Sequence, residues 1–287
     1  WATEIIEQFN EKNTDVTVSS LPADSGPGGQ WYIERLTVLR AAGTAPDIFY
    51  GASDKMNFVL KGWTLDLTPF IQRDQAELKV NTFFPGVLDS FALQGKTYGI
   101  PLAVTPQLIF YNRDMFENHG VAPLPYDWNK TTWTWDDMVD YGRKFTKRDA
   151  EGAYSQVALS RAGEMHLPDL TWIFGGDWFD VDSYKAGKVN KITMLRGENI
   201  EAYEALLDYY QSYAAAGPPK GIDPGGAFTG GKAAMEWIGA WRINAFMATD
   251  LGWQWGIGPM PLVKTRGNTR WTDPLFVSDT TKHAEEA

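Results

Sequence analysis

Carboxylates and tryptophans are the residues whose types and positions in this chain point to ligand binding. Asp54 follows the apolar strand predicted at 46–50, at the carboxyl edge where open sheets bind ligands. Its carboxylate can accept two hydrogen bonds from hydroxyl groups, although it is equally explained as a charge at a helix N-terminus. Trp241 follows Gly239-Ala240 at a predicted strand-to-helix turn. It is therefore a candidate for stacking on a ligand, with core packing as the alternative.

Two further pairs of residues are candidates for ligand contact. Thr105 and Gln107 come after an extended segment and are expected to face a ligand. The alternative is that they are ordinary polar residues of a loop. Asp169 and Trp172 precede a glycine pair and are weaker candidates. Thirteen tryptophans are an unusual share, and an indole packs well on the apolar face of a pyranose ring. A tryptophan-rich core is the alternative, and it must explain most of them.

Several other chemistries are disfavoured. The chain has no cysteine and three scattered histidines, so neither thiolate nor zinc chemistry is expected. Asp177, Asp180 and Asp182 lack the glycine and closing glutamate of a calcium loop. No pair of carboxylates has a local setting that suggests an acid and a nucleophile. We therefore predict no catalytic residues, no metal and no cofactor.

The bulk composition bounds the class of protein. A chain of 287 residues fits two domains, and its 44% apolar and 22% charged residues are ordinary for a globular protein. The net charge of −10, without a basic run, disfavours nucleic acid and anionic lipid as partners. No run of about 18 apolar residues is present. We interpret both ends as cut, so that a secretion signal or lipid-attachment cysteine would lie upstream.

The first half of the chain alternates between helical and strand patterns. Helices are predicted around 5–9 and 31–39, and strands at 16–20 and 46–50. This order predicts a parallel sheet with crossover helices. Two more strands are expected, at 97–101 and 108–111.

The second half begins with a capping box, in which Thr134 and Asp137 start a helix from Trp135 to about Lys147. The remaining patterns predict, in order, a strand at 155–160, helices at 167–174 and 199–216, a buried strand at 233–238, a helix at 241–249 and a strand at 255–262.

Several motifs, in this order, resemble the extracellular solute-binding proteins of the bacterial sugar-importer class, which include the maltose- and maltodextrin-binding proteins. The most specific stretches are Gly95–Pro101 followed by Ile109–Phe116, and Phe228–Met235 followed by Gly239 and Trp241. Ala45–Tyr50, Gly62–Leu67 and Thr132–Asp137 add weaker matches. Each piece alone is weak, but together they cover nearly the whole chain.

The resemblance implies an α/β fold of the periplasmic-binding-protein type, with two lobes joined by a hinge and a ligand cleft between them. We expect lobe 1 at 1–105 with its first strand missing upstream, a hinge strand and helix at 106–120, and lobe 2 at 121–260. Residues 261–287 are expected to return toward lobe 1, and the C-terminal helices are expected to be missing.

The resemblance also implies a function. The chain is expected to bind an oligosaccharide or related polyol, as a monomer, and to deliver it to the permease subunits of an ABC transporter. Its expected location is the periplasm or the outer face of the membrane, either free or lipid-anchored. In the family the tryptophan at position 241 commonly stacks on a sugar ring. A glycosidase-like enzyme and a surface lectin without a transporter are the alternatives, and the sugar itself is not identified by the sequence.

Overall fold

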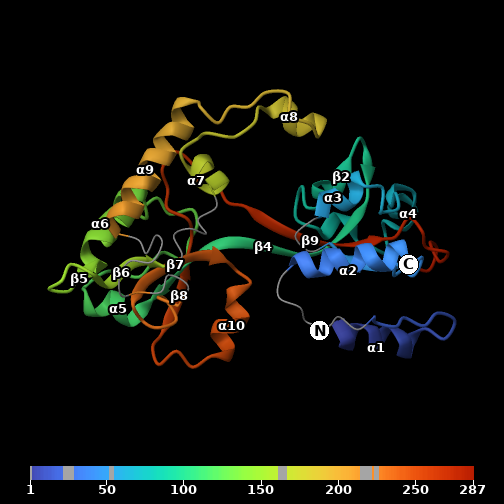
Figure 1. Cartoon of the computed structure of the whole chain (residues 1–287), viewed down its shortest axis with the longest axis horizontal. Helices are drawn as coiled ribbons and strands as arrows, with labels where there is room; N and C mark the ends of the chain where they lie inside the picture. The colour runs from blue at the N-terminus through green and yellow to red at the C-terminus, as the bar shows by residue number, and fades with distance from the viewer. Residues whose placement is uncertain (1, 22–28, 52–54, 161–166, 214–221, 223–225) are drawn as a thin grey trace. The chain divides into compact units, whose positions relative to one another are not determined.

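The computed structural model describes residues 2–21, 29–51, 55–160, 167–213, 222 and 226–287 (Figure 1). The chain forms two compact units. Unit 1 contains residues 1–104 and 272–287, and unit 2 contains residues 105–271. The two boundaries fall inside strands β4 (Gly99–Asn112) and β9 (Arg270–Val277). Each unit mixes helices with strands, as expected for the α/β class.

Unit 1 is built around a short antiparallel strand pair. β1 (Ile48–Tyr50) pairs with β9, with Phe49 opposite Phe276. These two rings pack with Phe58 and Phe91 into a small buried cluster. The hairpin of β2 (Ala92–Leu93) and β3 (Lys96–Thr97) lies in the same unit. The helices of unit 1 are α1 (Ala2–Lys12), α2 (Gly29–Ala41), α3 (Lys55–Leu60) and α4 (Thr68–Asp74), with 3-10 turns at Val80–Thr82 and Leu88–Phe91.

The predicted strand at 16–20 is wrong, because the structure has no strand there. The amide of Asn10 explains the difference. Its nitrogen donates to the Val18 carbonyl and its oxygen accepts from the Val18 N–H, both at 2.8 Å. This side chain satisfies the backbone groups that a neighbouring strand would otherwise pair. The parallel arrangement expected for this half of the chain is also wrong for β1, whose partner β9 runs antiparallel to it.

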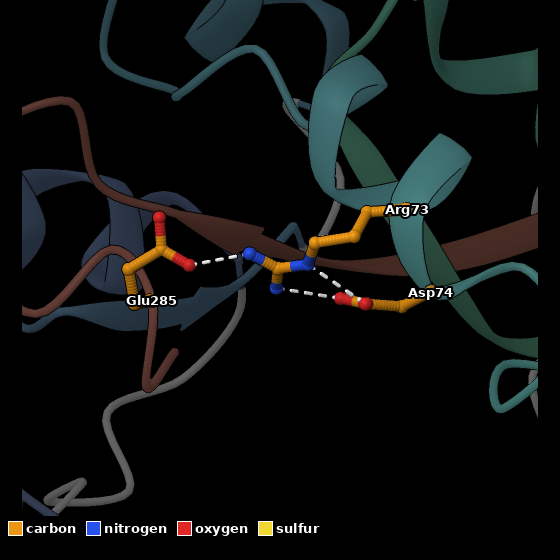
Figure 2. Close-up of polar contacts among 3 residues, drawn as sticks. All are labelled: Arg73, Asp74 and Glu285. Carbon is orange, nitrogen blue, oxygen red and sulfur yellow. Dashed lines mark hydrogen bonds and ion pairs between the residues drawn. The ribbon is translucent and has the colours of Figure 1, made fainter.

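The end of the chain is tied to unit 1 by exposed ion pairs. The Arg73 guanidinium donates to the Asp74 carboxylate at 2.8 and 2.7 Å and to Glu285 at 2.5 Å (Figure 2). Arg40 pairs with Asp279 at 2.5 Å. Exposed pairs of this kind contribute little to stability one at a time. They connect residues 279 and 285 to α2 and α4.

Unit 2 is organised around the buried strand β7 (Ala233–Gly239), which is enclosed along its whole length. The strand β6 (Tyr154–Ser160) pairs with β7 in parallel, and β4 pairs with β7 antiparallel. β8 (Trp255–Gly258) pairs with β4, and β5 (Lys147–Arg148) pairs with β6, both antiparallel. The sheet is therefore mixed rather than purely parallel.

The strand predicted at 97–101 is divided between β3, which ends at Thr97, and β4, and the strand predicted at 108–111 is the later part of the same long strand β4. Pro101 and Pro106 lack amide hydrogens, so neither can donate to a neighbouring strand. The strand tolerates Pro106 because this residue needs only its carbonyl, which accepts from the Ala240 N–H at 2.8 Å. Along its C-terminal half β4 is buried between β7 and β8.

Helices cover the unit 2 sheet and enclose an aromatic core. The capping box predicted for Thr134 and Asp137 is confirmed, and α6 runs over Trp135–Phe145. Trp135 packs on Tyr209 of α9 (Gly197–Tyr213), and Figure 1 shows the two helices side by side. Trp133 is 1% exposed and its indole donates to the Pro259 carbonyl at 3.0 Å. The other helices are α5 (Arg113–Asn118), α7 (Leu167–Ile173), α8 (Val181–Ala186) and α10 (Arg242–Ala248).

Candidate functional site

The candidate site on unit 2 begins where β7 ends and α10 starts. Gly239 is the last residue of β7, and it lies opposite Gln107 of β4 in the antiparallel register. The Ala240 N–H donates to the carbonyl just before Gln107, which fixes the turn to β4. Trp241 is the N-cap of α10 and supplies no side-chain cap. The indole is thus placed at the rim of a sheet whose interior is fully packed.

Trp241 lies on the backbone of Gly239. A Cβ at position 239 would overlap the six-membered ring of the indole, so only glycine admits the ring in this position. Trp241 keeps 47% of its surface exposed, which is large for an indole lying on its own strand. The core-packing alternative is therefore not what the structure shows for this residue, and its role in binding stays a prediction.

A buried carboxylate lies three residues before Gly239. Glu236 is 0% exposed, and its carboxylate lies 3.8 Å from the guanidinium of Arg242. Arg242 in turn lies over the ring of Phe246, 4.7 Å from its centroid. Burying a carboxylate is unfavourable unless it is paired, and Arg242, the residue after Trp241, supplies a positive charge for Glu236. Neither residue was predicted from the sequence, although a lone charge in the apolar strand Ala233–Gly239 is a signal that predicts such a pair.

Gln107 is held by a side chain from far along the chain. The Asn268 amide accepts from the Gln107 N–H at 3.0 Å and donates to its carbonyl at 2.8 Å. The Gln107 side chain is 3% exposed, and its Oε1 has no hydrogen-bond partner within the described parts of the chain. A buried polar atom of this kind calls for an explanation. Thr105 lies two residues earlier in β4, on the same face of the strand, and is half-buried.

Asp169 and Trp172 of α7 both hold the segment 264–271. The Thr269 hydroxyl donates to the Asp169 carboxylate, and Asp169 is 0% exposed. The Thr265 hydroxyl donates to the Trp172 carbonyl at 2.6 Å. The backbone of Gly267 passes close to Trp172, because a Cβ added at position 267 would overlap the Cβ of the Trp172 side chain. Asp169 therefore positions a neighbouring segment, and the half-buried Trp172 supports it.

Arg266 connects the same segment to other parts of unit 2. Its guanidinium donates to the carbonyl of Met260 at 3.0 Å and to that of Lys130. Burial lowers the pKa of the guanidinium from its usual value, and the charge of Asp127 opposes this shift. These bonds are the reason that the segment 264–271 has a defined course without regular secondary structure before β9.

The segment 264–271 joins four of the six predicted site residues. It contacts Gln107 through Asn268, Asp169 through Thr269, and Trp172 through Thr265 and Gly267. It ends at Trp271, whose ring meets that of Trp241 edge to face at 6.2 Å. Thr105 is linked to this group only through β4. Asp54 lies outside the described residues.

Polar side chains also gather in unit 1, at the carboxyl end of β1. The Tyr50 N–H donates to the Tyr32 hydroxyl at 3.1 Å, and Lys55 pairs with Asp273 at 2.8 Å. Burial and a hydrogen bond to Asp273 raise the pKa of the Tyr50 phenol. This is the end of the strand at which the sequence predicted a ligand-binding loop.

The described residues contain neither a cluster of metal ligands nor a candidate membrane span. No group of three or more histidine, cysteine, aspartate or glutamate side chains is placed to hold a metal ion. Among the same residues, no helix combines the length and the apolar character needed to cross a membrane.

Comparison with known proteins identifies the class. The sequence profile of the family described as "Bacterial extracellular solute-binding protein" matches residues 1–287. The chain therefore belongs to this family, and the resemblance seen in its motifs is confirmed.

Individual relatives are distant. A protein of Brucella abortus (strain 2308), named only as a binding protein, is 23% identical over 99% of this chain and 66% of its own length. An arabinooligosaccharide-binding protein of Halalkalibacterium halodurans is 24% identical over 90% of this chain and 55% of its own. The chain thus spans less than two thirds of the length of these relatives.

Solved structures share the fold. The ABC substrate-binding protein Lmo0181 of Listeria monocytogenes, solved in complex with cycloalternan, superposes with a TM-score of 0.76. It is 23% identical, and the match covers 99% of this chain and 69% of that one. The expected periplasmic-binding-protein fold is confirmed.

Proposed function

We propose that the chain is the carbohydrate-binding component of a bacterial ABC importer, and that it binds an oligosaccharide or related polyol without catalysis. The observation that carries the proposal is Trp241. Its indole is 47% exposed and lies on Gly239 at the end of a fully buried strand. An indole fixed in this way offers a flat apolar surface that matches the C–H face of a sugar.

Polar groups next to the indole support a ligand rich in hydroxyl groups. Gln107 lies opposite Gly239 in the strand register, and its Oε1 is buried without a hydrogen-bond partner in the described part of the structure. Glu236 offsets the charge of Arg242, which favours a neutral ligand over an anion. The sugar-binding names of several relatives agree with this chemistry.

The partners and location are part of the same proposal. A periplasmic or cell-surface location fits the family description, which is of extracellular proteins. Delivery to permease subunits, a monomeric state and a lipid anchor or its absence are proposed with it. The lobe boundaries expected from the sequence, at 1–105, 106–120, 121–260 and 261–287, are likewise proposed as the functional lobes. Asp54 and Thr105 remain predicted ligand contacts.

Titration calorimetry against a panel of mono- and oligosaccharides tests the proposal. We expect saturable one-to-one binding of at least one sugar. Chromatography of the same mixtures after prolonged incubation is expected to return the sugars unchanged. Absence of binding across the panel contradicts the proposal. Cleavage that disappears on substitution of a single carboxylate favours the glycosidase alternative.

A further inference from the structure

Trp271 is a second indole beside the candidate site, and no motif in the sequence pointed to it. Its ring meets that of Trp241 with centroids 6.2 Å apart and planes inclined by 81°. Trp271 is half-buried, and it is the second residue of β9. The two rings therefore form two nearly perpendicular walls, which we name the aromatic corner.

Both walls are held by backbone that has little freedom to move. Trp241 lies against Gly239, where no Cβ fits. Trp271 lies two residues after Thr269, and Asn268 and Thr269 are hydrogen-bonded to Gln107 and Asp169 respectively. Edge-to-face packing adds a preference of its own for the perpendicular arrangement. The corner is thus formed before any ligand arrives, so binding does not have to order it.

A perpendicular corner selects ligands by shape. A closed sugar ring offers a flat C–H face to one indole and a ring edge to the other at the same time. An acyclic polyol has no fixed apolar face, and it must lose the freedom of several torsions before it fits. A pre-formed corner therefore favours rigid rings over open chains that carry the same hydroxyl groups.

We propose that Trp271 is a specificity-determining residue, and that the aromatic corner formed with Trp241 requires a closed sugar ring and discriminates against acyclic polyols. This inference rests on the proposed function and narrows it from sugars and related polyols to ring sugars.

The first experiment measures the ring preference. Maltose, mannobiose and arabinobiose are titrated by calorimetry to establish that the chain binds a sugar. Glucose, mannose and arabinose are each titrated beside the alditol obtained by reducing them, because only these alditols contain no ring. For every pair that binds, the closed form is expected to bind at least about ten-fold more tightly.

The second experiment removes one wall. Trp271→Ala is expected to weaken binding of the tightest closed sugar about three- to ten-fold and to reduce the preference over its alditol. Trp271→Phe keeps an aromatic wall and should retain most of both. Trp128→Ala is the matched control, because Trp128 is also in unit 2 and is 42% exposed. It should change neither quantity.

A spectroscopic readout separates the geometry of the corner from its function. Two indoles this close give an exciton couplet in the far-ultraviolet circular dichroism spectrum. The couplet should be lost in both Trp271→Ala and Trp241→Ala and kept in Trp128→Ala, without any ligand. If Trp271→Ala fails to fold, Trp271→Leu, which keeps an apolar side chain but has no ring, supplies the binding comparison.

Each outcome bears on a separate claim. No binding by any sugar overturns the proposed function and this inference with it. Binding of alditols as tightly as closed sugars overturns the inference alone. So does a folded Trp271→Ala variant that has lost the couplet but keeps the affinity and ring preference of the unsubstituted protein.

Discussion

The aromatic core of unit 2 comes from one continuous stretch of chain, whereas the smaller core of unit 1 is completed by Phe276, on the strand that returns to it. In unit 2, β7 is enclosed along its length and carries the candidate site at its end. In unit 1, exposed ion pairs tie the last residues to the helices. We therefore expect the core of unit 2, which comes from one stretch of chain, to support a fixed indole better than the core of unit 1 would.

Removing a large core ring should produce the largest loss of stability. It should also distinguish the unfolding of unit 2 from that of unit 1. Trp133→Ala leaves a cavity and an unpaired carbonyl at Pro259, and is expected to cost about 3–5 kcal/mol of unfolding free energy. Only Trp1, Trp31 and Trp63 of the thirteen tryptophans precede residue 105. Urea unfolding followed by tryptophan fluorescence therefore reports mainly on unit 2.

Phe276→Ala is the matched change in unit 1, where the ring is 0% exposed. It should destabilise the protein while shifting the fluorescence transition less than Trp133→Ala does. Equal shifts of a single transition would mean that the two units unfold together, and the contrast drawn between their cores would then be wrong.

The next effect tests the glycine beneath Trp241. Gly239→Ala places a Cβ where the indole lies, so the ring must move, and sugar binding should weaken by about ten-fold or more. In a Trp241→Ala background the same substitution meets no indole and should have little further effect. Gly197→Ala is the control, since no atom lies within 4 Å of a Cβ there. Calorimetry of the four variants completes the comparison, and additive losses in the double variant would contradict it.

A smaller loss is expected from the side chain that holds Gln107. Asn268→Ala removes two hydrogen bonds to the backbone of a buried residue and should cost about 1–3 kcal/mol of stability. Asn268→Asp keeps an acceptor for the Gln107 N–H but loses the donor to its carbonyl, so its stability should lie between the two. Thermal unfolding measures the order of the three proteins. If Asn268→Ala were as stable as the unsubstituted protein, the two hydrogen bonds from Asn268 to the Gln107 backbone would not stabilise β4.

The smallest effect belongs to the surface of unit 1. Hydrogen bonds from the Arg73 guanidinium lower the pKa of the Asp74 carboxylate, and partial burial opposes the shift (Figure 2). Because the folded-state pKa is the lower one, this contribution is present above the unfolded value of about 3.9 and is lost as the pH falls through the folded pKa.

Thermal unfolding of Asp74→Asn and the unsubstituted protein between pH 7 and pH 2.5 checks this sign. The variant should be slightly less stable at pH 7, and the difference should close at the acid end. High salt should also reduce it. A difference that grows on acidification would contradict the assignment.

Local chemistry made much of unit 2 predictable. The capping box at Thr134 and Asp137, the buried strand near 233–238 and the helix after Trp241 all follow from spacing and residue type, and each is present. The false strand at 16–20 failed because its backbone is satisfied by Asn10, eight residues from Val18. No periodicity encodes that contact.

The candidate site was predictable only in part. Trp241 has a local signature, since a glycine at the end of a buried strand leaves room for its ring. Trp271, Asn268 and Thr269 have none, because their partners lie between 30 and 161 residues away along the chain. Glu236 was visible as a lone charge in an apolar strand, but its partner Arg242 becomes evident only once the turn at Gly239 is known.

Titration calorimetry of Trp241→Ala with the tightest sugar of the panel tests the central claim most directly. The claim is that this exposed indole is a ligand-binding surface supported by a separate core. The variant should bind at least about ten-fold more weakly, which corresponds to about 1.4 kcal/mol. It should also lose less stability than Trp133→Ala, and Trp128→Ala should bind normally. Unchanged sugar affinity in a folded Trp241→Ala protein, or unfolding as severe as that of Trp133→Ala, would contradict the account.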